Sequence, residues 1–158
     1  MKYIYYFIIL SCIFLTSISL RAQECTQYVG SCDYYLCREM NKKCSIKGYF
    51  INFGYKYCTK SINGLAAKIS TEGKDWIVQT SICLQERLDE VDDTNSCADI
   101  KMKATKLHDI CYQKSNFCSL SLLDKLKIMK MLIASFKEKG VLFEGVQVFN
   151  QCLHQRTF

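Results

Sequence analysis

Apolar residues recur at intervals of three and four positions through most of the second half of the chain, which is the spacing of one face of an α-helix. One such stretch starts after Ser70-Thr71, a pair suited to capping a helix, and ends at 92–95, where the sequence is Asp-Asp-Thr-Asn. Its inward positions are expected to be Trp76, Ile77, Thr80, Leu84, Leu88 and Val91. A second stretch follows Ser96, with expected inward positions Cys97, Ile100, Ala104, Leu107 and Cys111. The pattern therefore predicts two consecutive helices.

The most regular periodic stretch begins at Ser121, which together with Asp124 resembles a capping box. Its apolar stripe consists of Leu122, Leu126, Met129, Ile133 and Phe136. The lysines lie mostly off this stripe, at Lys125, Lys127, Lys130, Lys137 and Lys139. We interpret the stripe as a face buried in the core, with a helix lying on a membrane surface as the alternative. Gly140 is a natural end for this helix.

The remaining segments also favour helices. The 3.6-residue period continues through Leu142, Val146, Phe149 and Leu153, although 141–149 is also compatible with a strand. Segments 25–39 and 49–63 are expected to be helical as well. The chain has no proline, so nothing in its composition prevents long helices. The predicted fold class is all-α.

The N-terminal segment 1–22 is typical of a signal peptide. Lys2 gives it a positive end, 7–18 is an apolar run too short to span a bilayer, and Ala22 offers a small residue before a cleavage site. Lipidation at Cys12 is the alternative, but the apolar run continues beyond that cysteine. We therefore expect a secreted, extracellular protein with a single domain at 23–158 and no stable membrane insertion.

Cysteine is the most unusual feature of the composition. The chain has 11 cysteines, and ten follow the signal segment: Cys25, Cys32, Cys37, Cys44, Cys58, Cys83, Cys97, Cys111, Cys118 and Cys152. No pair has the C-x2-C spacing of a zinc module, so we expect no metal or other cofactor. An even number at irregular spacing in a secreted chain predicts about five disulfides, which would staple a small helical domain. The spacing alone leaves on the order of a thousand pairings open.

The net charge implies no particular partner. It is +6 for the whole chain and falls to +4 when Lys2 and Arg21 leave with the signal segment. This modest excess gives no reason to expect a nucleic-acid partner.

One string suggests an enzyme. His108-Asp109-Ile110-Cys111-Tyr112 matches the H-D-x-C-Y of secreted phospholipases A2, in which the histidine is a general base and the aspartate binds calcium. That chemistry needs a glycine-rich calcium loop upstream, and the chain has no glycine between Gly73 and Gly140. We therefore interpret His108 and Asp109 as surface residues, and expect His108→Ala to leave stability and binding nearly unchanged. A secreted calcium-dependent hydrolase using these two residues is kept as the alternative function.

Two other features leave structural alternatives open. The acidic run 86–93 lacks the glycine of a calcium-binding loop, so we expect a solvated turn there. The aromatic residues of 34–57 are compatible with a partner-binding surface and equally with the core of a small domain. They are Tyr34, Tyr35, Tyr49, Phe50, Phe53, Tyr55 and Tyr57.

Two longer motifs and the cysteine spacing carry a family resemblance. Residues 66–74 fit A-A-K-x-x-T-x-G-K and are followed by an aromatic residue and then Cys83, and residues 111–119 fit C-Y-x-K-x-N-x-C-S. Gly30-Ser31-Cys32 to Cys37 provides a C-x4-C step. In these features the chain resembles the stanniocalcins, a family of secreted, disulfide-rich helical glycoprotein hormones. The similarity covers essentially the whole of 23–158.

The resemblance implies a secreted, non-enzymatic, hormone-like protein that binds an extracellular receptor or protease. In that family the roles are calcium and phosphate regulation and the inhibition of an extracellular metalloproteinase. Transferred position by position, the family's disulfides would be Cys25–Cys37, Cys32–Cys58, Cys44–Cys97, Cys83–Cys111 and Cys118–Cys152. The family's interchain cysteine and its N-glycosylation sequon have no counterpart here. We therefore expect a monomer or a non-covalent homodimer without an interchain disulfide.

Overall fold

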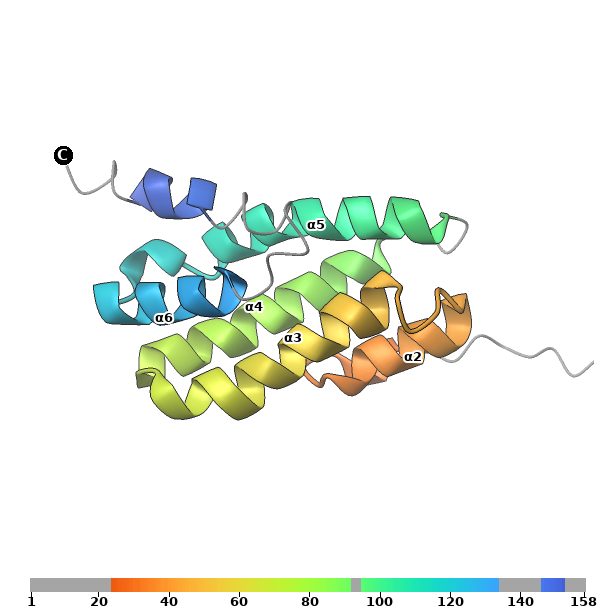
Figure 1. The fold of residues 1–158 in the computed structure, drawn as a ribbon, viewed down its shortest axis with the longest axis horizontal. Helices are drawn as coiled ribbons and strands as arrows, with labels where there is room; N and C mark the ends of the chain where they lie inside the picture. Colours follow the sequence, from red (N-terminus) through yellow and green to blue (C-terminus); the bar gives the residue numbers. More distant parts are fainter. Residues whose placement is uncertain (1–23, 92–94, 134–145, 153–158) are drawn as a thin grey trace, which may run out of the picture.

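Helices packed side by side make up the domain (Figure 1). The computed structural model describes residues 24–91, 95–133 and 146–152, so the predicted signal segment with Cys12 lies outside the described residues. Within those ranges no residue is in a strand. The four main helices are α2 (Asp33–Lys42), α4 (Thr71–Asp89), α5 (Cys97–Lys114) and α6 (Leu122–Ile133). The all-α prediction is confirmed.

A further long helical stretch covers 49–65 and changes its hydrogen-bonding pattern along its length. It consists of two π-helical parts, η2 (Phe50–Tyr55) and η3 (Lys60–Leu65), with the short α3 (Lys56–Thr59) between them. Figure 1 shows it as one rod lying against α2 and α4. The prediction of a helix at 49–63 is confirmed.

The first predicted helix, 25–39, is only partly right. The chain makes a single 3₁₀ turn, η1 (Thr26–Tyr28), and α2 starts only at Asp33. Gly30 separates the two with a backbone φ of +92°, a left-handed conformation that a helix cannot contain. Gln85 of α4 anchors this bend, because its side chain accepts from the Gly30 backbone N–H (2.6 Å) and donates to the Ser31 carbonyl (2.9 Å).

Helices α4 and α5 begin where the sequence predicts. The Ser70 side chain accepts a hydrogen bond from the Gly73 backbone N–H (3.1 Å), and Ser96 forms a full capping box with Asp99. Most of their predicted inward positions are buried, as expected. In the first stretch these are Trp76, Ile77, Thr80, Leu88 and Val91, and in the second they are Ile100, Ala104 and Cys111. Leu84 and Leu107 are half-buried, whereas Cys97 is exposed.

The predicted core face of α6 is wrong. Leu122, Leu126 and Ile133 are 57%, 52% and 42% exposed, and Met129 is only half-buried, whereas Phe136 lies outside the described residues. The buried face is formed instead by Asp124, Lys125, Ile128 and Leu132.

This face of α6 can be buried because its two polar side chains each form a hydrogen bond with another part of the fold. The Asp124 carboxylate accepts from the Ser70 backbone N–H (3.3 Å), and the Lys125 Nζ donates to the Cys118 carbonyl (2.6 Å). A buried charged group is tolerated when it is hydrogen-bonded in this way, and its aliphatic stem then packs as apolar surface.

The last described segment, 146–152, is helical, so the strand alternative is wrong for the part of 141–149 that the structure describes. Gly140, the predicted end of the α6 helix, lies outside the described residues. The chain enters α6 through a bend, in which the single turn η5 (Phe117–Ser119) is followed by an extended Leu120.

Five disulfides cross-link these elements, with Cα–Cα distances of 5.0–5.7 Å. The bonded pairs are Cys25–Cys37, Cys32–Cys58, Cys44–Cys97, Cys83–Cys111 and Cys118–Cys152. These are the same five pairs that the stanniocalcin resemblance implies. The domain is thus a small helical unit stapled by five disulfides.

The aromatic cluster of the N-terminal half forms part of the core. Tyr34, Tyr35, Tyr49, Phe50 and Phe53 are each no more than 5% exposed. The interpretation of this cluster as an exposed partner-binding surface is therefore wrong for these five residues.

Three polar side chains, those of Tyr34, Arg38 and Asp89, join α2 to the end of α4. The Asp89 carboxylate accepts from the Tyr34 hydroxyl (2.6 Å) and pairs with the Arg38 guanidinium (3.0 Å). Burial and this hydrogen bond hold the pKa of the Tyr34 hydroxyl well above its usual range. The neutral phenol and the ion pair together fix how α2 lies on α4.

Candidate functional site

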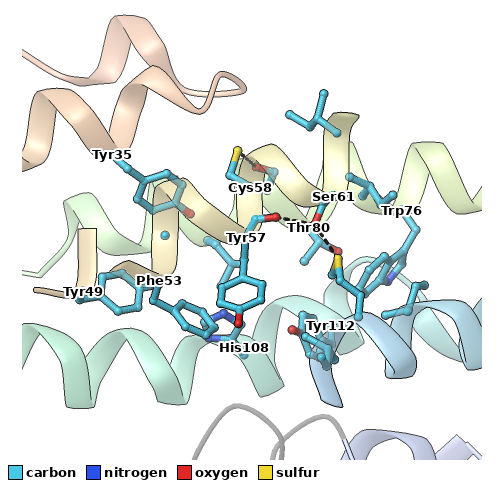
Figure 2. A pocket seen from close by; sticks show the side chains of 18 residues that line it. Tyr35, Tyr49, Phe53, Tyr57, Cys58, Ser61, Trp76, Thr80, His108 and Tyr112 are labelled. Atoms are coloured by element: carbon cyan, nitrogen blue, oxygen red, sulfur yellow. Dashed lines mark hydrogen bonds between the residues drawn. The ribbon is translucent and has the colours of Figure 1, made fainter. Parts of the chain in front are cut away.

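A cavity of about 70 Å³ lies between the 49–65 helix, α4, α5 and α6 (Figure 2). Its wall is mainly apolar and aromatic. Among the lining residues are Phe53, Tyr57, Ser61, Ile62, Trp76, Ile77, Thr80, His108, Tyr112, Ile128 and Leu132. Cys58 lines the cavity and is bonded to Cys32, and the Cys83–Cys111 bond joins α4 to α5.

Aromatic rings pack against one another along one side of the cavity. The His108 ring stands edge-on between Phe53 and Tyr112, with centroid distances of 5.6 Å to each. Trp76 packs against Tyr112 (5.3 Å) and Phe117 (5.4 Å). Figure 2 shows Phe53, Tyr57, His108 and Tyr112 on the same side of the cavity. The edge-to-face contacts of His108 and the tilted contacts of Trp76 give this wall a defined shape.

His108 is a core residue, so its interpretation as a surface residue is wrong. Only 4% of it is exposed, and its Nδ1 is 2.9 Å from the Ala104 carbonyl and 3.2 Å from the Thr105 carbonyl. Since a carbonyl only accepts, Nδ1 carries the proton and donates. Burial lowers the pKa of His108 to about 4, and the two backbone hydrogen bonds oppose this shift only in part.

Asp109 does not join His108 in a common site. It is half-buried, and its carboxylate accepts from the Gln113 side chain (2.8 Å), one turn along the outer surface of α5. Side chains at neighbouring helix positions point about 100° apart. This explains why His108 lies in the core whereas Asp109, the next residue, lies at the surface of α5.

The acidic run 86–93 is occupied by structural contacts as far as the structure describes it. Asp89 is bound to Tyr34 and Arg38, and Glu90 pairs with Arg87 (3.1 Å), whereas Asp92 and Asp93 lie outside the described residues. In the described part of the chain, no group of three or more His, Cys, Asp or Glu side chains is placed to hold a metal ion.

Two buried polar atoms belong to residues that line the cavity and have no hydrogen-bond partner among the described residues. They are the indole Nε1 of Trp76 and the hydroxyl Oγ1 of Thr80. Both residues are 5% exposed, and they lie one turn apart on α4. The Ser61 hydroxyl, by contrast, has hydrogen-bond acceptors in the Tyr57 carbonyl (2.8 Å) and the Met131 sulfur (3.3 Å).

The two motifs that carry the stanniocalcin resemblance shape the backbone at the end of α5 and at the start of α4. Asn116 has a left-handed backbone (φ +60°), and its carbonyl accepts from the Ser119 N–H (3.1 Å), which shapes the turn after α5. Gly73 leaves room for Ile69, because a Cβ at Gly73 would lie 2.3 Å from the Ile69 Cγ1. The motifs thus position the end of α5 and the start of α4.

Sequence reasoning missed the cavity and its polar atoms. The one signal was Thr80, a hydroxyl residue among the otherwise apolar inward positions of its helix. An unpaired hydroxyl can be recognised only when its surroundings are known, because most buried side-chain hydroxyls find a partner.

Within the described residues no helix is long and apolar enough to cross a membrane. Comparisons of the chain with protein-family models, with curated proteins and with solved structures found no match.

Proposed function

We propose that this chain is a secreted, non-enzymatic protein of the stanniocalcin type, which acts by binding an extracellular protein. The observation that carries the proposal is the agreement between the disulfide pairs implied by the resemblance and the five pairs in the structure. Ten cysteines allow on the order of a thousand pairings, so agreement at all five is specific. Five disulfides are also compatible with an extracellular protein, because disulfides persist in oxidising compartments.

The geometry at His108 and Asp109 favours binding over hydrolysis. A general base must reach a water molecule and the substrate, whereas His108 is buried and its pKa of about 4 makes it a weak base. Asp109 bonds to Gln113, away from the imidazole contacts of His108. We therefore rank the phospholipase-like alternative second.

The exposed face of α6 offers a surface for a protein partner. Leu122, Leu123, Leu126 and Ile133 are 42–62% exposed on one helix, and exposed apolar groups gathered in this way are typical of interaction sites. Lys130 is exposed on the same helix and favours a partner with acidic groups around an apolar contact. The partner is thus expected to be an extracellular protein that presents an apolar patch with an acidic rim.

The test uses the full chain produced in a eukaryotic secretory host. We expect oxidised protein in the medium, and saturable binding to an extracellular protein that unlabelled native protein competes away. The matched variant is Leu126→Lys, which should weaken binding at least tenfold while its unfolding free energy stays within about 0.5 kcal/mol of wild type. Retention of the protein inside the cell, or binding that reduced and alkylated protein reproduces, would contradict the proposal.

A second assay separates the two functions. Purified protein is incubated with phosphatidylcholine vesicles and calcium, and released fatty acid is measured. We expect no turnover above that of heat-denatured, reduced protein. Turnover that His108→Gln abolishes in a folded variant would reverse the ranking.

A further inference from the structure

We propose that the cavity between the 49–65 helix, α4, α5 and α6 binds a small, neutral, mainly apolar molecule with one hydrogen-bond acceptor, such as a short-chain ketone. This inference is independent of the proposed protein partner. It rests on the cavity itself and on the two unpartnered polar atoms of residues that line it, the Trp76 indole Nε1 and the Thr80 Oγ1 (Figure 2).

The polar atoms define what the ligand must supply. The indole N–H only donates, and a hydroxyl can donate as well as accept, so one acceptor atom between them would satisfy both. Trp76 and Thr80 are four residues apart on α4, which places their side chains on the same face of the helix. Leaving a buried donor without a partner is costly, so a carbonyl oxygen at this point removes that cost.

The wall defines the rest of the ligand. Phe53, Ile77, Ile128 and Leu132 line the cavity and are buried, so the body of the ligand must be apolar. Ile62, at 39% exposure, is the most solvent-exposed of the apolar lining residues and marks the side on which a longer chain could leave the cavity.

The size of the cavity limits the part of the ligand that it encloses. About 70 Å³ is roughly half of a 150 Å³ cavity known to hold benzene in another protein. The enclosed part of the ligand is therefore about three to five non-hydrogen atoms.

The absence of charged side chains from the described lining favours a neutral ligand. None of the described lining residues is Asp, Glu, Lys or Arg, so no group is available to pair with an ionised ligand. His108, which also lines the cavity, stays uncharged at neutral pH because burial depresses its pKa. An ion would lose its hydration without compensation.

The single tryptophan of the chain makes a direct test possible. Trp76 gives the only indole N–H signal in a ¹H–¹⁵N NMR spectrum of the oxidised protein, since the sequence contains one tryptophan. The probes are 2-butanone and 2-methyl-1-butene, which have nearly the same shape but differ in carrying C=O or C=CH₂. We expect 2-butanone to shift the Trp76 indole signal saturably, and to bind on the order of tenfold more tightly than the alkene.

Three variants link the effect to Thr80. Thr80→Val keeps the shape but removes the hydroxyl, and should weaken 2-butanone binding severalfold while leaving alkene binding unchanged. Thr80→Ser keeps the hydroxyl and should retain the preference for the ketone. Thr105→Val is the matched control, because its hydroxyl bonds to the Lys101 carbonyl on α5 and Thr105 is not a lining residue.

Three outcomes would overturn the inference. They are no saturable shift with either probe, equal affinity for both, and an undiminished preference for the ketone in folded Thr80→Val. The first would mean that water satisfies Trp76 and Thr80 and is not displaced.

Discussion

At the scale of single residues, His108 shows how burial changes the meaning of a motif. From the sequence alone, the motif His-Asp-x-Cys-Tyr suggests a catalytic site. In the fold, His108 packs between two aromatic rings, and Cys111 is bonded to Cys83. The histidine therefore contributes to the core as a neutral ring.

The depressed pKa of His108 predicts that stability is lost in mild acid. The unfolded chain binds a proton at His108 near the usual pKa of 6.5, whereas the folded chain does so only near 4. Stability is thus fully present above pH 6.5 and falls as the pH drops toward 4, because protonation favours the unfolded state. Between pH 7 and 4.5 this amounts to about 2 kcal/mol.

Denaturant unfolding of the oxidised protein at both pH values checks this prediction, with His108→Gln as the comparison. The variant should be less stable at pH 7, since it loses the ring contacts, but should lose about 2 kcal/mol less than wild type on acidification. This replaces the sequence-based expectation that substitution of His108 is nearly neutral. An equal loss in both proteins would show that His108 titrates normally.

At the scale of elements, helix packing in this domain depends on where side chains are absent as much as on where they are present. Gly54 in the 49–65 helix faces Tyr35 of α2, and a Cβ there would lie 2.4 Å from the tyrosine ring. Tyr35 is 3% exposed, so the ring has little room to move. The glycine sets how closely these two helices approach.

Two glycine substitutions in the same helix separate this packing effect from helix propensity. Gly54→Ala should destabilise the fold by about 1–3 kcal/mol, because overpacking outweighs the gain in helix propensity. Gly64→Ala is the control, since nothing lies within 4 Å of its Cβ, and it should stabilise by about 0.5–1 kcal/mol. Thermal unfolding of both variants decides the matter. A Gly54→Ala protein as stable as Gly64→Ala would mean that α2 moves aside freely.

At the scale of the whole molecule, the disulfides join elements that are far apart in the sequence. Cys44–Cys97 ties the loop after α2 to the start of α5, across 53 residues. Cys97 is exposed and Cys44 half-buried, so removing this bond leaves little empty space in the core. Its contribution is therefore expected to arise mainly from restricting the unfolded chain.

Replacement of both cysteines of this bond by serine should lower the free energy of unfolding by about 4 kcal/mol, the loop-closure value for a loop of this length. Denaturant unfolding measures the loss, and peptide mapping verifies that the other four bonds are intact. A loss below about 1 kcal/mol would indicate that the unfolded chain is already compact without this cross-link.

Local features of the sequence determined where α4 and α5 begin and most of the positions that they bury. Ser70 and Ser96 cap α4 and α5 with the hydrogen bonds expected of them, and most of the inward positions predicted from the apolar period are buried. Caps and periodicity act within one helix, so they can be read without knowledge of the fold. The disulfide pairs came only through the resemblance, because cysteine spacing by itself does not select partners.

Tertiary structure alone decided which side of α6 is buried and where the cavity lies. The leucine stripe and the opposite face of α6 both satisfy a helical period, and the choice between them depends on Asp124 meeting Ser70 and Lys125 meeting Cys118. The unpartnered atoms of Trp76 and Thr80 likewise depend on what three other helices bring near α4. Contacts between distant segments fix these features, and hydrophobic pattern carries no information about such contacts.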